Sequence, residues 1–308
     1  MSQKNVLIVS NTDDAHATAV QDRLRERSIL VGRLDSDTFT FGQHVWRIRS
    51  DTNLESSSSW YVPDVNVIWY RKVRFPEPTN AVRSFLNQEA QGLFDCILAD
   101  YHDCRWVNPR DRLAEARSKI VQLQRAKGAG LRIPDTIVTT SVEALGEFSA
   151  RHNGQIVAKP IQAQIVGSGD DALVIGTRQL SLGHFESAVR FSPCYAQERL
   201  SLKSEIRVVA FGDRLHSFRL TAKEKADDLK QLKLSKIDHE RCELDESTSR
   251  KIRSVMSLYG LEFAAIDLAV IDDEEPVFLE LNPNGQWLWL QYMTGENLID
   301  PFIDLLCP

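Results

Sequence analysis

The chain has 308 residues, of which 43% are hydrophobic and 26% are charged, so it is long enough for about two domains and apolar enough to bury a sizeable core. Its formal net charge of -6 argues against a general nucleic-acid binder, which would carry a basic surface. No apolar run approaches the roughly 18 residues that a membrane-spanning helix needs, so we expect no membrane partner. The five cysteines are widely spaced and form no CxxC pair, which indicates reduced thiols in a cytoplasmic protein.

The first third of the chain predicts a layer of parallel strands and helices. Apolar strand-like runs alternate there with amphipathic helix-like runs, at residues 5–10, 17–28, 29–34, 65–70 and 80–98. This alternation is typical of an α/β sheet with parallel strands, which we expect to end near residue 110. The opening apolar run predicts a strand, because it is too short for a signal peptide and no cleavage site follows it.

The turn after the first expected strand contains no glycine. Residues 11–14 read Asn-Thr-Asp-Asp. A dinucleotide-binding site at this place needs the pattern G-x-G-x-x-G, whose glycines let the backbone approach the pyrophosphate. We therefore expect any nucleotide to bind elsewhere in the chain, and an oxidoreductase built on this layer is disfavoured.

The remaining two-thirds of the chain predict an α+β arrangement with mostly antiparallel strands. A helix is expected over residues 111–127, and glycines follow it directly. Its apolar stripe is formed by Leu113, Ala116, Ile120 and Leu123. Two more helices are expected, over 141–152 with Ser141 as the N-cap and over 247–259. Short strand-like runs dominate the rest of the chain from residue 155 onwards.

The last two strand-like runs, residues 265–271 and 276–282, predict a hairpin with Asp267 directly opposite Glu280. The acidic residues between the runs suit a turn, and a two-residue turn pairs these two positions. Because side chains alternate between the faces of a strand, one face carries Asp267, Glu280 and, two residues on, Asn282. The opposite face is wholly aliphatic and is formed by Ile266, Leu268, Val270, Val277, Leu279 and Leu281.

Two opposed carboxylates need a cation between them. Directly opposed side chains of neighbouring strands have Cβ atoms about 4.5 to 5.5 Å apart, and like charges repel there. Magnesium takes oxygen ligands, typically one or two carboxylates together with phosphate oxygens. We therefore expect Asp267, Glu280 and Asn282 to hold Mg²⁺. Two alternatives remain: both acids face water, or a turn with an odd number of residues places them on opposite faces of the sheet.

Phosphate groups bound beside this metal would need positive side chains. Lys159 shares an expected strand face with Val157 and Ile161, where a buried ammonium needs an anionic partner. Lys119 lies at the edge of the apolar stripe of the helix expected over 111–127. Each lysine is also compatible with a side chain whose stem covers apolar surface while its ammonium stays in water.

Two further features are candidates for phosphate contacts. Residues 164–170 predict a loop whose NH groups can close over phosphates, although the loop lacks the Lys-Ser/Thr ending of a Walker motif. Arg207 and Glu205 share one face of a strand that ends at a Gly212-Asp213 turn. Arg207 is placed to contact phosphate oxygens or a developing acyl phosphate, and a surface ion pair is the alternative.

In their order along the chain these residues resemble the ATP-grasp superfamily. The resemblance covers about residues 106–290, and the hairpin set is its most specific part. It rests on Lys119, Lys159, the segment AQERL (196–200), the segment EIR (205–207), and the set Asp267, Glu280 and Asn282. The resemblance implies an ATP-grasp fold preceded by an α/β domain, and it implies ATP and Mg²⁺ as cofactors.

The same resemblance implies roles for the individual residues and three domains. Lys119 and Lys159 would bind the phosphates of ATP, and Lys159 and Arg207 would act in catalysis. The nucleotide pocket would be lined by Gln197, Glu198, Arg199, Leu200 and Glu205. The domains would be an N-terminal α/β domain (1–115), a central subdomain with the phosphate loop (116–193) and a C-terminal subdomain with the magnesium site (194–308).

Three motifs suggest a narrower resemblance, to the microviridin-type peptide ligases, or graspetide synthetases. They are ELNPNGQW (280–287), WVNP (106–109) and WYRK (69–72). This resemblance implies an enzyme that joins acidic side chains of a ribosomally made precursor peptide, recognised with its leader segment, to Thr, Ser or Lys side chains. It also implies a homodimer.

One segment departs from the pattern of those ligases. Residues 228–230 read Asp-Leu-Lys, where many of them carry Asp-Trp-Arg. The surrounding tract, 223–241, is rich in charges of both signs and is expected to be either a solvated helix or a peptide-facing surface altered for another substrate. Two other functions therefore stay open: a ligase for a free amino acid, dipeptide or protein tail, and a non-catalytic nucleotide-binding protein of the same fold.

Overall fold

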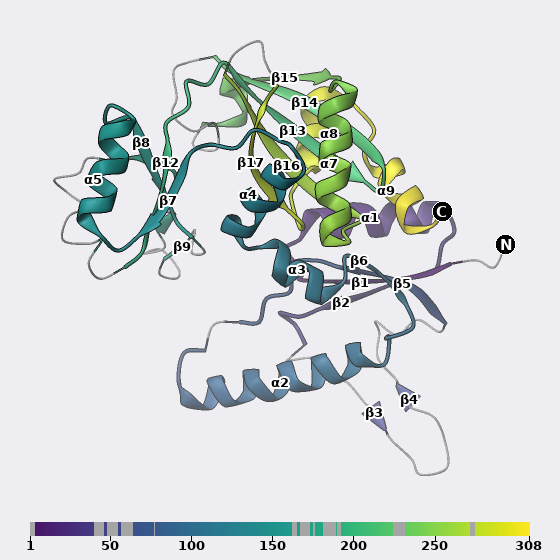
Figure 1. Ribbon diagram of the computed structural model, residues 1–308. Helices are drawn as coiled ribbons and strands as arrows, with labels where there is room; N and C mark the ends of the chain where they lie inside the picture. Colours follow the sequence, from purple (N-terminus) through teal and green to yellow (C-terminus); the bar gives the residue numbers. More distant parts are fainter. Residues whose placement is uncertain are drawn as a thin grey trace. The chain divides into compact units, whose positions relative to one another are not determined.

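The computed structural model describes residues 4–39, 46–47, 55–56, 64–76, 78–161, 165–166, 173–174, 176–180, 189, 192–223, 229, 232–271 and 275–308. The chain divides into two compact units, whose elements are labelled in Figure 1. Unit 1 comprises residues 1–113, 261–263 and 284–308, and unit 2 comprises residues 114–260 and 264–283. Among the described residues, no helix combines the length and the apolar character that a membrane crossing requires.

Unit 1 is built on the parallel sheet that the sequence predicts. Its four strands lie in the order β2 (Val31–Asp35), β1 (Asn5–Ser10), β5 (Val65–Tyr70) and β6 (Arg105–Val107). Residues 6–9 of the central strand β1 are completely buried, because a parallel sheet is covered on both faces. Two short strands, β3 (Trp46–Arg47) and β4 (Glu55–Ser56), form a separate antiparallel pair.

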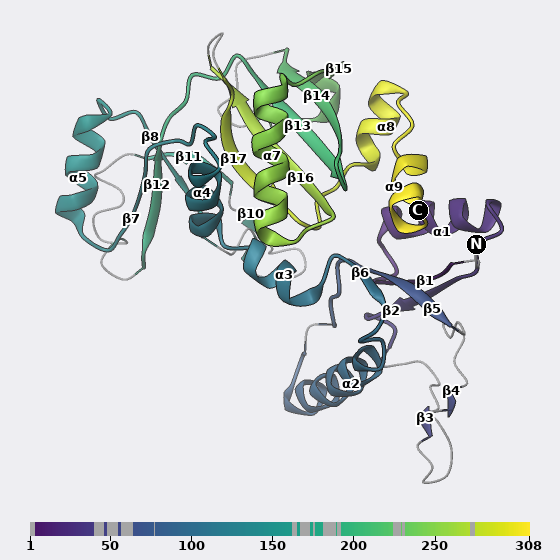
Figure 2. The ribbon, with the colours of Figure 1, turned by 45° about the vertical axis from the view of Figure 1, so that its right-hand side comes forward.

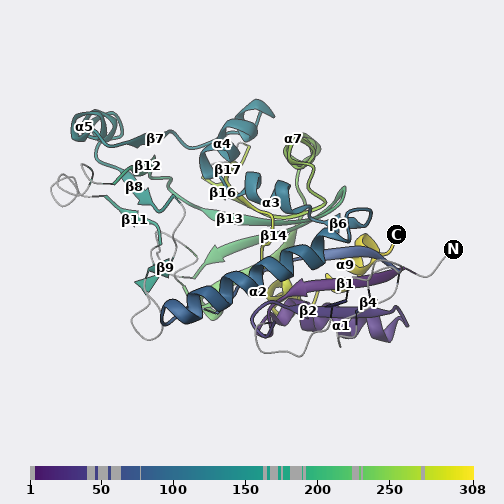
Figure 3. The same ribbon diagram turned by 90° about the horizontal axis from the view of Figure 1, so that it is seen from below.

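Helices from both ends of the chain are among the described elements of unit 1. They are α1 (Ala15–Glu26), α2 (Ala81–Ala99), α8 (Leu288–Thr294) and α9 (Ile299–Leu306). Helices α1 and α9 pack against each other although they come from opposite ends of the chain (Figure 2). Helix α2 is seen from the side in Figure 3. Its C-terminal half buries Phe94, Ile97 and Leu98.

A buried ion pair joins β5 to the start of α1. Asp14 caps α1 by accepting a hydrogen bond from the His16 amide, and its Oδ2 accepts from Ser10 Oγ at 2.8 Å and from Arg71 Nε at 2.5 Å. Burial raises the pKa of Asp14, but the Arg71 guanidinium and the hydrogen-bond donors outweigh it and hold this pKa below its usual value. The glycine-free turn after β1 therefore carries a helix cap and a compensated buried charge.

Unit 2 contains a small antiparallel sheet and a larger sheet. The small sheet has the order β11 (Arg178–Gln179), β8 (Ile156–Lys159), β12 (Cys194–Glu198) and β7 (Thr136–Thr139). Helix α5 (Val142–Arg151) packs on it through Leu145 and Phe148, and Ser141 caps this helix as predicted. A further pair is formed by β9 (Ile165–Val166) and β10 (Leu173–Val174).

The larger sheet of unit 2 carries the predicted hairpin. Its order is β15 (Ile237–Cys242), β14 (Arg214–Ala222), β13 (Ser204–Phe211), β16 (Phe263–Val270) and β17 (Val277–Asn282). A two-residue turn at Gly212-Asp213 connects β13 to β14, as the sequence predicts. Helices α4 (Lys119–Gly128) and α7 (Glu246–Tyr259) lie side by side against this sheet (Figure 2). Gly260 ends α7 at a φ of 61°, in the left-handed region that glycine tolerates best.

The continuous helix expected over residues 111–127 is wrong, because the chain forms two helices there. Helix α3 spans Arg110–Ala116, and α4 begins at Lys119 after an extended Ser118 with φ -74° and ψ 103°. The expected apolar stripe also fails in part. Ile120 is 37% exposed, whereas the neighbouring polar side chain of Gln122 is buried. The break turns α4 so that a polar residue faces the sheet.

The register of the last hairpin is confirmed at its functional end and shifted near its turn. Asp267 pairs with Glu280, as predicted, but Leu268 pairs with Phe278. Leu279 is thus the extra residue of a β-bulge, and Phe278 is buried in place of the expected Leu279. Near the turn the pairing differs from the predicted register by one residue. The bulge adds one residue to β17, so beyond it Asp267 and Glu280 face each other as predicted.

The charged tract at 223–241 ends in a strand, so the solvated helix, one of the two alternatives for this tract, is wrong for its described end at 234–241. Residues 237–242 form β15, which pairs with β14 along its length, and the short 3₁₀ turn Leu234–Lys236 precedes it. The sheet provides ladder hydrogen bonds that override the mixed-charge pattern of the sequence. Residues 228 and 230 lie outside the described residues, and with them most of the Asp-Leu-Lys segment.

Candidate active site

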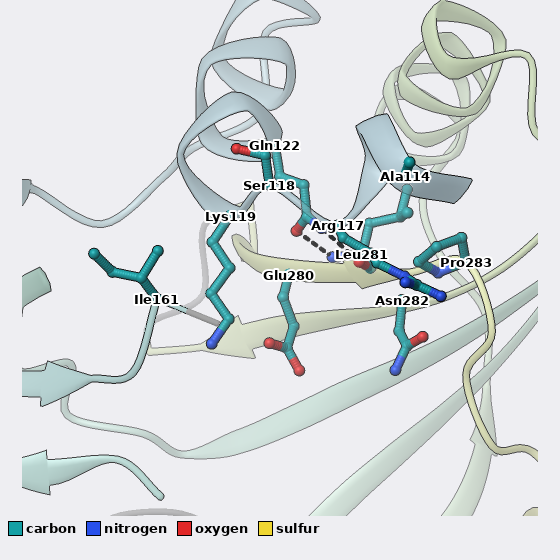
Figure 4. A pocket seen from close by; sticks show the side chains of 10 residues that line it. All are labelled: Ala114, Arg117, Ser118, Lys119, Gln122, Ile161, Glu280, Leu281, Asn282 and Pro283. Carbon is teal, nitrogen blue, oxygen red and sulfur yellow. Dashed lines mark hydrogen bonds between the residues drawn. The ribbon is translucent and has the colours of Figure 1, made fainter. Parts of the chain in front are cut away.

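A pocket of about 580 Å³ lies in unit 2 beside the start of α4 and the end of β17. Three of the residues singled out in the sequence line it: Lys119, Glu280 and Asn282. Figure 4 shows their side chains pointing to the same side. Glu280 and Asn282 are two residues apart on one strand, so strand alternation alone places them on a common face. Lys119 joins them because α4 packs along β17.

Asp267 stands opposite Glu280 and is held by an arginine. Arg207 on β13 donates a hydrogen bond from Nη1 to Oδ1 of Asp267. The side chains of Arg207 and Asp267 are only 13% and 5% exposed. The sequence left a phosphate contact or a surface ion pair open for Arg207, and the structure shows an ion pair in which Arg207 is half-buried and Asp267 is buried. Arg207, Asp267 and Glu280 thus form one charged row across three neighbouring strands.

Lys119 contacts the chain segment that directly follows Lys159. The ammonium of Lys119 donates to the carbonyl oxygen of Pro160 at 2.7 Å, and Pro160 directly follows Lys159. Lys159 is half-buried at the end of β8, where it pairs with Tyr195 of β12. Ile161, the next described residue after Pro160, lines the pocket. The end of β8 therefore borders the same region as α4.

The negative charge of Glu280 affects the pKa of Tyr195 on the small sheet. Burial, together with the negative charge of Glu280, raises the pKa of Tyr195 to about 12. The Tyr195 hydroxyl accepts a hydrogen bond from Gln197 Nε2 at 3.0 Å. This tyrosine therefore stays neutral at physiological pH and adds no charge near Glu280.

The segment proposed to meet the nucleotide base lies on β12 and just beyond it. Gln197 is buried and also donates to Thr136 Oγ1 at 3.0 Å, while Glu198 Oε1 accepts from the backbone NH of Asp135 at 2.8 Å. Arg199 donates to Gln155 Oε1 at 3.0 Å. The side chains of Leu200 and Glu205 are half-buried and buried respectively. Because β12 pairs with β8, this segment and Lys159 lie on neighbouring strands.

The phosphate loop expected at residues 164–170 lies outside the described residues, except for Ile165–Val166. Those two residues form β9. The structure therefore gives no position for the glycines of this loop.

Two residues of the pocket escaped the sequence analysis. Arg117 lines it at the break between α3 and α4, so its position depends on a helix interruption that the periodic pattern conceals. Gln122 also lines the pocket and is only 3% exposed. A polar residue three positions after Lys119 shares its helix face, and this spacing was the available signal for Gln122.

The oxygen donors at this site fit a hard divalent cation. Asp267, Glu280 and Asn282 offer two carboxylates and one carboxamide, which suits Mg²⁺ completed by phosphate oxygens and water. No cluster of three or more His, Cys, Asp or Glu side chains that could hold a metal occurs among the described residues. A site with only two acids needs ligands from a bound molecule, so the donor set indicates a metal that arrives with a polyphosphate.

No protein-family model matches the sequence, and no curated protein matches it either. The fold, in contrast, is shared along nearly the whole chain with solved ATP-grasp ligases. The structures described below are 19% to 22% identical to this chain, so their likeness shows the fold. The chain therefore has the ATP-grasp fold, with the α/β domain in front of it that the sequence predicts.

Three examples, each with bound ligands, illustrate this likeness. The macrocyclase MdnC from Microcystis aeruginosa MRC, bound with precursor peptide MdnA, is 22% identical, with a TM-score of 0.83 over 98% of this chain and 99% of that chain. A RiPP-associated ATP-grasp ligase of Chryseobacterium gregarium, in complex with ADP and a leader and core peptide, is 21% identical, with a TM-score of 0.82 over 99% and 96%. The ATP-grasp ligase PsnB, complexed with minimal precursor, Mg and ADP, is 19% identical, with a TM-score of 0.76 over 99% and 98%.

Proposed function

We propose that this chain is an ATP-dependent ligase that activates carboxylates as acyl phosphates and joins them to hydroxyls or amines. The observation that carries the proposal is the pairing of Asp267 with Glu280, beside Asn282 and Lys119 at one pocket. Facing carboxylates repel each other unless a cation lies between them. Magnesium bound with ATP would supply that cation and neutralise charge on the phosphate oxygens.

The proposed chemistry needs positioning and charge rather than an enzyme nucleophile. A substrate carboxylate oxygen attacks the γ-phosphorus of ATP, and the bond from that phosphorus to the β–γ bridging oxygen breaks, which gives an acyl phosphate and ADP. A hydroxyl or amine then attacks the acyl carbon, loses its proton and expels phosphate, so that an ester or an amide forms. Lys119 and Lys159 would hold phosphate oxygens, and Arg207 would stabilise the charge on the transferred group.

The nucleotide base would lie against β12 and the segment that follows it. Gln197, Glu198, Arg199 and Leu200 are on or next to a strand that neighbours Lys159, so base and phosphates could be held from adjacent strands. Glu205 is buried near the start of β13 and would contribute from the larger sheet. We therefore assign these five residues to nucleotide binding.

A ribosomally made precursor peptide is the proposed substrate, with its acidic side chains as the carboxylates. Similar structures of MdnC, the Chryseobacterium ligase and PsnB contain precursor, leader or core peptides, and two of them contain ADP. The likeness covers nearly the whole of each chain, the N-terminal layer included. We propose that residues 1–115 form a domain before the ATP-grasp subdomains at 116–193 and 194–308, although residues 284–308 of the last segment pack with unit 1.

We propose further that two copies of this chain associate through α2. The N-terminal half of α2 exposes Val82, Phe85 and Leu86, at 68%, 60% and 48%. With Leu93 they follow helical spacing and form one apolar stripe. A single helix face of this kind can pair with its own copy about a two-fold axis, because each copy supplies the surface that the other needs.

A cytoplasmic location accompanies this proposal. All five cysteines are free thiols in the structure, which suits a reducing compartment, and ATP is supplied there.

Mass spectrometry of a candidate peptide tests the function. The enzyme is incubated with ATP, Mg²⁺ and any short acidic peptide that a neighbouring reading frame encodes, and each ring closure should remove one water from the peptide while ADP is released. The Glu280→Gln variant, which keeps the shape of the side chain, should release no ADP. ADP release with free amino acids and none with the peptide would replace this proposal by a small-molecule ligase. Nucleotide binding without any turnover would indicate a non-catalytic protein.

A further inference from the structure

Gln122 makes an unusual set of hydrogen bonds with the strand that carries the proposed metal ligands. Its Oε1 accepts from the backbone NH of Leu281 at 2.9 Å, and its Nε2 donates to the Leu281 carbonyl oxygen at 2.7 Å (Figure 4). The same Nε2 donates to the carbonyl oxygen of Ala116 at 2.6 Å. Both polar atoms of this buried side chain are therefore used, and all their partners are backbone groups.

Gln122 takes the place of a neighbouring strand at the outer edge of β17. β17 is the last strand of its sheet, and no further strand pairs with its outer edge among the described residues. At one end of that edge, the Phe278 NH donates to the Arg132 carbonyl oxygen at 2.8 Å. At the other end, the carboxamide of Gln122 imitates a peptide group and satisfies both backbone groups of Leu281. At this edge a side chain, rather than a further strand, satisfies the backbone hydrogen-bonding groups of β17.

Leu281 lies between the two pocket-facing ligands. Glu280 precedes it and Asn282 follows it, and both project to the face opposite the Leu281 side chain. Holding the NH and the carbonyl of Leu281 therefore fixes the backbone on both sides of it. Lys119 is three residues before Gln122 on α4, so the helix that holds the strand also presents the lysine. The bond to Ala116 ties the end of α3 to the same point and satisfies a carbonyl at a helix terminus.

We infer that Gln122 is a positioning residue that holds Glu280 and Asn282 in register with Lys119, so that a divalent cation bound with a nucleotide meets a preformed ligand set. This inference rests on the proposed function, because it assigns no chemistry of its own to Gln122. Groups that orient metal ligands without touching the metal typically change metal affinity by about 10-fold to 100-fold when they are removed. A buried glutamine that only filled space would change stability and leave metal affinity unaltered.

Binding of Mn²⁺, followed by electron paramagnetic resonance in the presence of ADP, tests the inference without turnover. Gln122→Leu keeps the size of the side chain but removes all three hydrogen bonds, and Gln122→Glu keeps the acceptor but loses the donor. Both variants should bind Mn²⁺ about 10-fold more weakly than the unaltered chain. Gln124→Leu is the matched control, because Gln124 is an exposed glutamine of the same helix, and its Mn²⁺ affinity should not change.

The outcomes separate this inference from the proposed function. If Glu280→Gln abolishes Mn²⁺ binding while folded Gln122→Leu binds as tightly as the unaltered chain, the inference fails and the metal site stands. If Glu280→Gln also leaves Mn²⁺ binding unchanged, the proposed function itself fails. Should neither Gln122 variant fold, hydrogen exchange of the unaltered chain decides. Slow exchange of the Leu281 amide is expected, and exchange as fast as that of an exposed loop amide would overturn the inference.

Discussion

Arg207 and Asp267 form a buried ion pair on neighbouring strands of the larger sheet, and Asp267 in turn faces Glu280. One guanidinium thus compensates one of the two opposed carboxylates. The arrangement tolerates the two acids before any metal arrives, because part of their charge is already compensated.

Replacing Arg207 by Gln should destabilise the protein, and a metal nucleotide should reverse part of the loss. Breaking a buried pair typically costs about 3 to 5 kcal/mol, since it leaves an uncompensated charge. Thermal unfolding should therefore shift down without Mg²⁺ and recover partly with Mg²⁺ and ADP. Arg214→Gln, at the exposed start of β14, is the control. Equal stability of Arg207→Gln and the unaltered chain, with and without Mg²⁺, would contradict the role of this pair.

Lys119→Met should weaken nucleotide binding. Removing the ammonium takes away a positive charge at the pocket, and a loss of roughly 1.4 kcal/mol corresponds to a 10-fold rise in Kd. Isothermal titration with Mg²⁺ and ADP measures this change. Lys127→Met provides the comparison, because Lys127 is exposed near the other end of the same helix. Unchanged affinity in Lys119→Met would remove this lysine from the nucleotide site.

His16 should make the stability of unit 1 depend on pH. Its Nε2 accepts hydrogen bonds from the backbone NH groups of Trp287 and Leu288, both at 2.9 Å, at the start of α8. Burial, together with the nearby Arg71 guanidinium, lowers the pKa of His16 to about 3. The folded state therefore keeps this ring neutral, whereas the unfolded state takes up a proton below about pH 6.5.

Acidification should thus reduce stability. Because the unfolded chain binds more protons, the free energy of unfolding contributed by His16 falls between about pH 6.5 and pH 3, by about 2 kcal/mol from pH 7 to pH 5. Denaturant unfolding at the two pH values measures this slope. His16→Gln, which retains an acceptor, should be less sensitive to pH by that amount, and His102→Gln, at an exposed site, should behave like the unaltered chain. Parallel pH profiles for all three proteins would rule out His16 as the source.

Phe85→Glu should separate the proposed dimer. A charge in the centre of the apolar stripe on α2 would have to be buried without a partner. Light scattering after size exclusion should give the mass of two chains for the unaltered protein and one chain for the variant. Gln91→Glu adds the same charge to an exposed position on the opposite side of α2 and should leave the dimer intact. A single-chain mass for the unaltered protein would show that α2 does not mediate self-association.

Part of the candidate site could be predicted because it depends on local pattern. Asp267, Glu280 and Asn282 lie on two adjacent runs joined by a short turn, and alternation along a strand decides which side chains share a face. The register needed one correction, the bulge at Leu279, which a sequence pattern cannot place because either strand can absorb the extra residue. The N-terminal ends of three helices, α1, α5 and α7, are also locally encoded. Their N-cap residues Asp14, Ser141 and Asp245 accept hydrogen bonds from amides of their own helices.

The rest depends on residues that are far apart in the chain. The break between α3 and α4 turns Gln122 toward Leu281, 159 residues away, and nothing in the helix period records that partner. The pairing of Arg207 with Asp267 likewise spans 60 residues. Residues 237–242 form the strand β15, although their mixed charges are also compatible with a helix. They do so because the open edge of β14 offers backbone hydrogen bonds.

The sequence by itself determined that two acids and an amide share one strand face and that lysines and an arginine accompany them, because side-chain periodicity along a segment is a local property. Only the tertiary structure decided which charges meet and which helix side chain closes the edge of β17. Those contacts depend on the packing of α4 and β13 against the hairpin, and packing between distant segments leaves no periodic trace in the sequence.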